Sequence, residues 1–275
     1  MMPGVEQRKE QIADLDIAWR EAPSRGVAAP VVYVHGVPSS SSDWLPFLER
    51  TGGFAPDLPG FGESGKPNHF NYSIEGYDAF LRAYVDHLGL DRFSLVMHDW
   101  GSVGLALAQA MPERVERIVA ISVVPFTAGY RWHRVARIWR TALLGELFMG
   151  YSFKWGMRRA SREWLAAPGP APDAMVDEVW SHWDHGTQRA ILKLYRSAPP
   201  GVLEAAGARL GTVKAPALIA WGEDDPYLPP PFAAALAERL GGPAEVEVLR
   251  GARHWPWLDR PELVDRVVRF LSAKP

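Results

Sequence analysis

The sequence predicts an α/β fold, in which a mostly parallel central sheet is flanked by helices and a helical cap is inserted into the chain. Two observations lead to this prediction. Short apolar, β-prone runs alternate with helical patterns in the first and last parts of the chain, as is typical of a parallel sheet covered on both faces. Between residues 125 and 209 the alternation stops, and only helical patterns remain.

The length of the chain supports the same organisation. With 275 residues the chain is near the upper limit for one compact core, and it suits one large domain or one domain with an insertion. We therefore predict a core formed by residues 1–124 and 210–275 and a cap, or lid, formed by residues 125–209.

The individual elements follow from the periodicity of apolar residues along the chain. The patterns predict strands at residues 15–19, 31–34, 94–97, 118–123, 217–221 and 246–249 and helices at residues 74–88, 100–112, 232–240 and 262–271. The run 31–34 is continuously apolar, as expected of a buried parallel strand. Residues 15–19 alternate, which indicates a half-exposed strand near a sheet edge. Gly89 and Gly241 follow two of the helices and are typical helix ends.

The predicted cap is rich in tryptophan and arginine. It holds six of the twelve tryptophans, namely Trp132, Trp139, Trp155, Trp164, Trp180 and Trp183. Most of them are expected to stabilise the cap, and one or two facing the site would make an apolar cavity. Four arginines, Arg131, Arg134, Arg137 and Arg140, recur along one predicted helix and favour a solvated helix face over an anion site.

Asp99 is the most informative residue of the chain. It lies at the apex of a predicted strand, sharp turn and helix, the arrangement in which a turn presents a nucleophile clear of the sheet. The N–H groups of the following helix favour negative charge there. The alternative is an aspartate that only caps that helix.

Two histidine loops and one acidic loop follow other predicted strands. His35-Gly36-Val37-Pro38 comes directly after the buried strand 31–34, and the backbone N–H groups of Val37 and Trp100 could together form an oxyanion hole. Asp224 and Asp225 follow the strand 217–221, and His254 follows the last strand. Because the carboxyl ends of parallel strands meet at one edge of the sheet, these residues are expected near Asp99.

An aspartate nucleophile selects a type of substrate. Serine attacking a saturated carbon would leave an ether, which activated water cannot hydrolyse. A carboxylate leaves an ester, and water activated by His254 as general base can regenerate Asp99. Attack of aspartate on a carboxylic ester would pass through an anhydride, a poor route. Asp99 therefore favours substrates displaced at an sp³ carbon over the substrates of an ordinary esterase or lactonase.

Several motifs resemble one known family. His-Gly-Val-Pro at 35–38, Met-His-Asp-Trp-Gly at 97–101, Asp-Leu-Pro-Gly-Phe-Gly-Glu-Ser at 57–64 and His-Trp-Pro-Trp-Leu-Asp-Arg-Pro-Glu at 254–262 are similar to the epoxide hydrolase and haloalkane dehalogenase branch of the α/β-hydrolase fold family. The order nucleophile, acid, base also matches, over nearly the full chain.

The resemblance implies roles for individual residues. Asp225, three residues after Gly222, takes the place of the family's acid in preference to Asp224, and would orient His254. His98 and His35 compete with His254 as base. Met97 departs from the small residue usual two positions before the nucleophile. The substrate pocket is expected to include His35, Pro38, Trp139 and Trp255.

The leaving group separates two candidate functions. Leu194-Tyr195-Arg196 resembles the segment that supplies a ring-opening tyrosine in epoxide hydrolases, so Tyr195 would protonate the oxygen of an opening epoxide. Tyr130 and Tyr151 are poor substitutes for a second tyrosine. In the alternative, a haloalkane dehalogenase, the indole N–H groups of Trp100 and Trp139 would bind the departing halide. The tyrosine favours an epoxide hydrolase that gives vicinal diols, and the complete triad disfavours a non-catalytic protein of this fold.

Charge and composition limit the partners. The formal net charge is −2, which argues against nucleic acid or an anionic membrane as the main partner. The chain has no cysteine, a polar start and no run of about 18 apolar residues. We expect a cytoplasmic enzyme that acts on a small apolar epoxide or alkyl halide and water and needs no metal or cofactor. A homodimer is compatible with this expectation.

Overall fold

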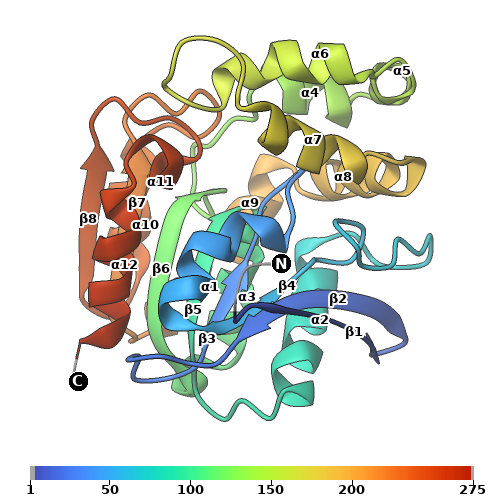
Figure 1. Ribbon diagram of the computed structural model, residues 1–275. Helices are drawn as coiled ribbons and strands as arrows, with labels where there is room; N and C mark the ends of the chain where they lie inside the picture. The colour runs from blue at the N-terminus through green and yellow to red at the C-terminus, as the bar shows by residue number, and fades with distance from the viewer. Residues whose placement is uncertain (1–3, 274–275) are drawn as a thin grey trace.

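An eight-stranded sheet forms the centre of the molecule (Figure 1). The structure is a computed structural model that describes residues 4–273, so the outermost residues of the predicted core lie outside it. The strands are β1 (Glu6–Ile12), β2 (Leu15–Ala22), β3 (Val31–Val34), β4 (Gly53–Pro56), β5 (Phe93–Asp99), β6 (Val115–Val123), β7 (Ala217–Gly222) and β8 (Ala244–Leu249). Their order across the sheet is β1-β2-β4-β3-β5-β6-β7-β8, and β2 is antiparallel to both of its neighbours while all other pairs are parallel.

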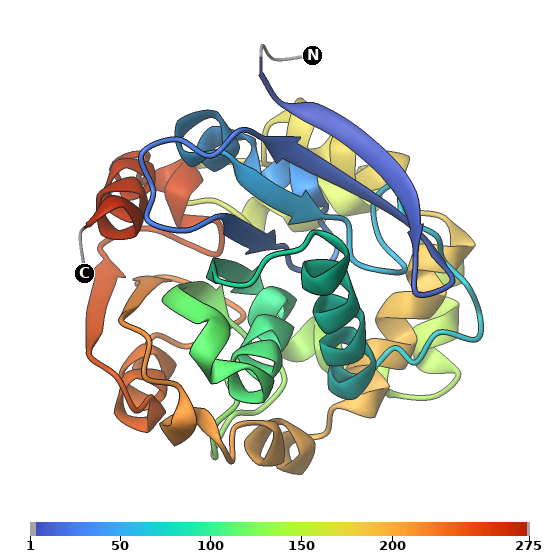
Figure 2. The same cartoon turned by 90° about the horizontal axis from the view of Figure 1, so that it is seen from below.

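Helices cover both faces of the sheet, as Figure 2 shows from below. The core helices are α1 (Leu45–Thr51), α2 (Ile74–His87), α3 (Val103–Ala110), α10 (Pro231–Arg239), α11 (Pro256–Asp259) and α12 (Glu262–Ser272). Side chains of β5 alternate between the faces. Leu95 and Met97 pack in the apolar core shared with α2 and α3, and Val96 packs in the core shared with α1 and α12. The predicted α/β fold class is confirmed.

Two strands were not predicted, for different reasons. The first six residues of β1 are exposed and polar, because β1 lies at the sheet edge and pairs with β2 alone. It therefore lacks the apolar alternation that marks a strand. β4 has only four residues, Gly53–Pro56, and two of them are Gly53 and Pro56, which are depleted in strands.

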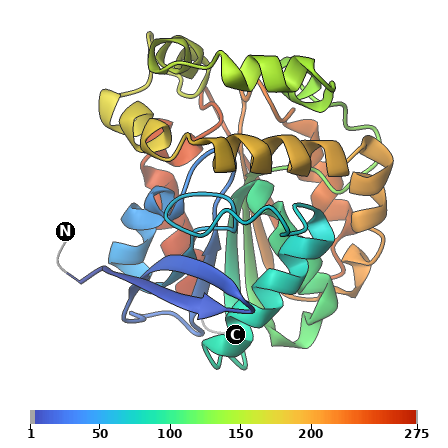
Figure 3. The same cartoon turned by 90° about the vertical axis from the view of Figure 1, so that its right-hand side faces the viewer.

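The chain between β6 and β7 forms helices and covers the carboxyl ends of the central strands. These helices are α4 (Arg134–Arg140), α5 (Leu144–Gly150), α6 (Lys154–Ala160), α7 (Asp173–Ser181), α8 (His185–Ser197) and α9 (Pro200–Ala206). In Figure 3, α8 lies between the sheet and the outer helices α5 and α6. α9 adjoins α3 of the core, since Gln109 Nε2 donates to the Ala206 carbonyl oxygen at 2.9 Å. The covering helices, here called the cap, are therefore α4–α8.

Short 3₁₀ turns complete the described chain. They are η1 (Ser41–Trp44), η2 (Trp100–Ser102), η3 (Pro112–Arg114), η4 (Ser161–Glu163) and η5 (Leu210–Thr212). The helix expected directly after Asp99 thus begins as the 3₁₀ turn η2 and becomes α-helical at Val103. Among residues 4–273, no helix is both long and apolar enough to span a bilayer.

Candidate active site

Asp99 ends β5 in a strained backbone conformation, with φ 50° and ψ −119°. Such a conformation costs of order 1–3 kcal/mol for a residue other than glycine and persists only where the surroundings enforce it. Here the Val37 N–H donates to Asp99 Oδ1 at 2.9 Å. A Cβ atom at Gly36 would lie 2.4 Å from Asp99 Cβ, so glycine at position 36 is required for this approach.

Met97 does not disturb this turn. Its side chain is fully buried and runs over the first turn of α3, where a Cβ atom at Gly104 would lie 2.7 Å from Met97 Sδ. The missing side chain at Gly104 provides the room that the larger residue needs.

Asp99, His254 and Asp225 lie together at the ends of β5, β8 and β7. His254 Nε2 is 3.5 Å from Asp99 Oδ2, and His254 Nδ1 is 2.9 Å from Asp225 Oδ2. The second oxygen of Asp225 accepts the backbone N–H groups of Tyr227 and Leu228, at 2.9 and 3.0 Å. These bonds orient the carboxylate, and the carboxylate in turn holds the imidazole with Nε2 toward Asp99.

The neighbouring Asp224 faces a different way. Its backbone N–H donates to the Ala252 carbonyl oxygen at 2.9 Å, and its side chain lines a separate hollow beside Arg253. The geometry therefore brings Asp225, and not Asp224, to His254.

The charges of the three residues are coupled. Burial favours the neutral imidazole of His254, but Asp225 and Asp99 outweigh it and raise its pKa to about 10. Burial likewise opposes ionisation of Asp99, but hydrogen bonding and charge from His254, with the Val37 N–H, hold the pKa of Asp99 below its usual value. Both shifts favour a carboxylate at Asp99 beside an imidazolium at His254 over the neutral pair.

The two competing histidines hold loops in place. Burial, helped by the charge of His254, lowers the pKa of His98 to about 3, and His98 Nε2 donates to the His254 carbonyl oxygen at 2.8 Å. His35 Nδ1 donates to the Gly36 carbonyl oxygen at 2.7 Å, and its Nε2 accepts the Leu58 N–H at 2.9 Å. Both rings are fully buried. The prediction that His35 belongs to the substrate pocket is wrong, because loop contacts occupy both of its nitrogens and it does not line the cavity.

A cavity of about 430 Å³ lies over Asp99 and His254, between core and cap. Of the other residues predicted for the site, Val37, Pro38, Trp139, Tyr195 and Trp255 line it, whereas Trp100 does not. Most of the remaining lining is apolar and comes from the cap, including Phe148, Phe153, Met157, Trp164 and Trp183. Such a cavity suits a small apolar substrate with its reacting carbon at Asp99.

Tyr195 lies at the centre of an aromatic cluster over the nucleophile. Its ring centroid is 5.2 Å from Trp100 and 4.9 Å from both Trp139 and Trp132. Burial, followed by the charge of Asp99, raises the pKa of Tyr195 well above its usual value, so the phenol keeps its proton.

Two indole N–H groups of this cluster have no partner. Trp100 Nε1 and Trp139 Nε1 are buried, and neither has a hydrogen-bond acceptor among residues 4–273. The Trp100 indole lies beside the Tyr195 hydroxyl without forming a well-aligned hydrogen bond to it. Trp132 differs, because its Nε1 donates to the Ala198 carbonyl oxygen at 2.9 Å. Leaving a buried donor unpaired costs about 1–3 kcal/mol, so each of these two donors calls for a partner such as a water molecule, an ion or a ligand.

His133 lines the cavity and was not predicted from the sequence. Its Nδ1 accepts the Ala136 N–H at 3.3 Å, which caps α4. Burial lowers the pKa of His133 to about 4, so the ring is neutral and its proton resides on Nε2. In the sequence, His133 is a single histidine among four arginines, and this pattern does not predict a cavity-lining residue.

The Tyr130 hydroxyl is engaged by the backbone, and Tyr151 lines the cavity where it reaches the surface of the cap. The Tyr130 hydroxyl donates to the Tyr227 carbonyl oxygen at 3.4 Å. Tyr151 is 76% exposed on the cap. Neither supplies a second phenol over Asp99.

Comparisons with known proteins identify the family of the chain. A family model described as the alpha/beta hydrolase family matches residues 31–267. The chain is 27% identical over 263 residues to a haloalkane dehalogenase of Mycolicibacterium paratuberculosis, covering 89% of this chain and 84% of the relative. It is 26% identical over 269 residues to the 2-hydroxy-6-oxo-2,4-heptadienoate hydrolase of Pseudomonas putida, covering 90% and 91%.

Similarity to solved structures extends over nearly the whole chain. The haloalkane dehalogenase DbeA from Bradyrhizobium elkani superposes with a TM-score of 0.82 at 24% identity, covering 98% of this chain and 97% of DbeA. This similarity shows a shared fold. The family expected from the motifs is confirmed by the match to residues 31–267.

Proposed function

The chain belongs to the alpha/beta hydrolase family, and from this premise we propose that it is a haloalkane dehalogenase, which converts an alkyl halide and water into an alcohol, a halide ion and a proton. The observation that carries the proposal is the pair of buried, unpartnered indole N–H groups of Trp100 and Trp139, whose rings both pack against Tyr195. A departing halide needs hydrogen-bond donors and no proton. The name of the relative in Mycolicibacterium paratuberculosis supports the same chemistry.

In the first step a carboxylate oxygen of Asp99 attacks the halogen-bearing carbon. The new C–O bond forms an ester as the carbon–halogen bond breaks, and the halide leaves with the electron pair. The low pKa of Asp99 keeps the attacking oxygen ionised. The N–H groups of Trp100 and Trp139 stabilise the charge that develops on the halogen, which is the kind of preorganised donor arrangement that lowers a barrier.

In the second step water hydrolyses the ester. Esterification removes the charge of Asp99, which is one cause of the raised pKa of His254, so the pKa falls and the imidazolium releases its proton to solvent. This is the proton that the overall reaction yields, and the neutral ring can then act as a general base. His254 Nε2 then takes a proton from water, which attacks the ester carbonyl. The Val37 N–H, which already contacts Asp99 Oδ1, and the Trp100 backbone N–H stabilise the oxyanion. The intermediate then collapses with cleavage of the bond between the carbonyl carbon and the alcohol oxygen. The departing oxygen takes the remaining proton of the added hydroxyl, the alcohol leaves, and Asp99 is again a carboxylate beside protonated His254.

The preference expected from the sequence was epoxide hydrolase, and the alternative is now better supported. Tyr130 and Tyr151 do not provide a second phenol. Relatives covering most of this chain include a haloalkane dehalogenase.

Epoxide hydrolysis remains the second candidate because of Tyr195 and His133. Both line the cavity, and both are neutral with a proton to donate. An opening epoxide becomes an alkoxide, and these two groups could supply the donors that it needs.

A product assay separates the two candidates. Purified protein is incubated with 1-bromobutane or with styrene oxide, and released bromide and diol are measured. Bromide release that is lost in Asp99→Ala supports the dehalogenase. Diol formation without bromide release would reject it in favour of the epoxide hydrolase.

A further inference from the structure

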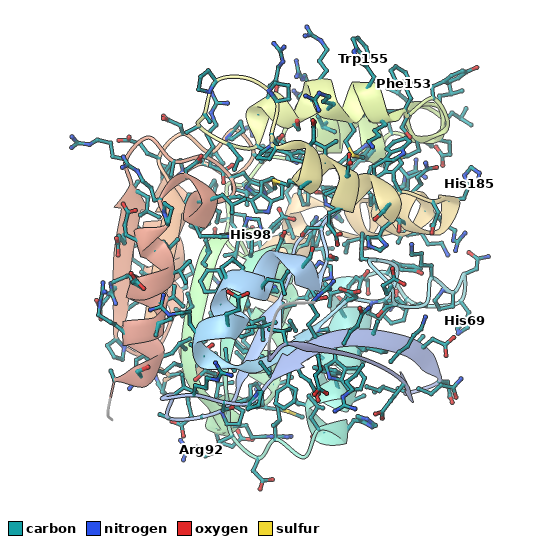
Figure 4. All side chains as sticks on the ribbon, in the orientation of Figure 1. His69, Arg92, His98, Phe153, Trp155 and His185 are labelled. Carbon is teal, nitrogen blue, oxygen red and sulfur yellow. The ribbon has the colours of Figure 1, made fainter. Side chains whose placement is uncertain are left out.

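Large apolar side chains gather on the outer surface of the cap. Ten large hydrophobic residues are markedly exposed among residues 4–273, and seven of them lie within residues 143–155. They are Leu143, Leu144, Leu147, Phe148, Tyr151, Phe153 and Trp155, with exposed fractions of 43–77%. Figure 4 shows Phe153 and Trp155 pointing away from the rest of the molecule. We call this set the apolar cap face. Contiguous exposed apolar surface of this kind usually marks an interaction site.

The segment that carries the apolar cap face is strongly basic. Residues 131–163 contain eight arginines and lysines and two glutamates, although the whole chain has 30 basic and 32 acidic residues. Five of the arginines have no carboxylate partner among residues 4–273: Arg131, Arg137, Arg159 and Arg162, together with Arg140, which donates to backbone carbonyl oxygens. The other basic residues include Arg134, Lys154 and Arg158, which pair with Glu163, Asp177 and Asp173. The small net charge of the chain therefore hides a local excess of positive charge.

The apolar cap face is continuous with the active-site cavity. Phe148, Tyr151 and Phe153 belong to both, because they are exposed on the cap and also line the cavity over Asp99. The cavity consequently reaches the surface among exposed apolar side chains.

We propose that the apolar cap face docks on an anionic lipid surface. The leucine and aromatic side chains would enter the boundary between headgroups and acyl chains, and the surrounding arginines would contact lipid phosphates. The cavity mouth would then face the bilayer, and an apolar substrate dissolved in lipid would reach Asp99 without crossing water. This proposal concerns the surface alone, and holds for either leaving group. It replaces the expectation, drawn from the net charge of −2, that an anionic membrane is no partner.

Charge favours lipid over a second copy of the chain. A two-fold interface places the same surface patch on both partners, so unpaired arginines such as Arg131 and Arg159 would approach the arginines of the other copy. An anionic surface instead supplies the opposite charge.

Vesicle co-sedimentation tests the proposal. The protein is mixed with vesicles of phosphatidylcholine, with and without phosphatidylglycerol, and bound and free protein are separated. We expect strong binding at low salt to the vesicles that contain phosphatidylglycerol. Leu147→Ser with Trp155→Ser should weaken it by about tenfold or more. Arg131→Gln with Arg159→Gln should weaken it by about 10- to 30-fold, and the effect should shrink with added salt.

A matched control uses exposed residues elsewhere. Leu258→Ser with Arg250→Gln removes one exposed leucine and one exposed arginine outside the cap, and should bind as the wild type does. Circular dichroism and thermal unfolding check that each variant is folded.

Three outcomes would overturn the proposal. The wild type could remain unbound on both vesicles, or it could bind equally with and without phosphatidylglycerol. Sedimentation equilibrium could also reveal a dimer that Leu147→Ser with Trp155→Ser dissociates, in which case a second copy covers this face.

Discussion

Replacing Trp139 by phenylalanine tests the proposed halide site most directly. Trp139 is buried, its indole N–H has no acceptor among residues 4–273, and its ring packs against Tyr195 with a centroid distance of 4.9 Å. Trp139→Phe keeps an aromatic ring in this contact and removes the N–H. The substitution therefore separates hydrogen bonding to a leaving group from packing.

The expected effect follows from the strength of one charge-assisted hydrogen bond. A hydrogen bond to a charged group contributes about 1.5–3 kcal/mol. Because 1.36 kcal/mol corresponds to a factor of ten in rate, the loss of one donor should slow carbon–halogen cleavage by about 10- to 150-fold. Single-turnover release of bromide from 1-bromobutane measures this step without interference from ester hydrolysis.

Trp132→Phe is the matched control. It removes the same part of a ring in the same cluster, but the Trp132 N–H already donates to the Ala198 carbonyl oxygen. That oxygen also accepts from Arg140 at 2.9 Å, so it keeps one partner. Trp132→Phe should lower the free energy of unfolding by about 1 kcal/mol more than Trp139→Phe does, with little effect on bromide release. Full bromide release by Trp139→Phe, or equal effects of the two substitutions on rate, would refute the halide site.

Three further predictions concern the triad. Asp99→Ala should abolish turnover in a folded protein, and Asp99→Ser should not restore it because an ether intermediate cannot be hydrolysed; substantial activity in either purified variant would reject the ester mechanism. His254→Gln should accumulate the alkyl ester of Asp99, visible as a mass increase of the intact protein, and turnover should fall by about 10²–10⁴-fold. Asp225→Asn should act in the same direction less severely. Normal turnover in His254→Gln would show that another base serves. Because the pKa of His254 is raised to about 10, its charge should stabilise the fold fully below about pH 6.5 and lose this contribution as pH rises through about 10. The free energy of unfolding, measured with urea across this pH range, should therefore fall in the wild type and not in His254→Gln. The same pH dependence in both proteins would contradict the assigned charge state.

Much of the core could be predicted because its signals are local. The continuous apolar run of β3 and the strand, turn and helix around Asp99 are each contained in a few consecutive residues. The choice of Asp225 over Asp224 required family resemblance, since the two carboxylates are adjacent in sequence. The structure separates them because only Asp225 approaches His254.

The cavity could be predicted only in part because its walls come from distant segments. Trp100, Trp139 and Tyr195 meet although some 95 residues of sequence separate the first from the last. The periodicity of apolar residues within each segment does not indicate that contact. His35 illustrates the converse error: its place in a motif suggested the pocket, but hydrogen bonds within the loops determine where the ring points.

The hydrogen bond from His98 to the His254 carbonyl oxygen has a consequence for engineering this protein. It ties the residue before the nucleophile directly to the backbone of the base, at 2.8 Å. Nucleophile, base and acid are thus fastened together within the core. Of the groups that would meet a leaving group, Trp139 and Tyr195 belong to the cap, whereas Trp100 belongs to the core. Grafting another cap onto this core should therefore change part of the leaving-group site while Trp100 and the spacing of the triad stay as they are.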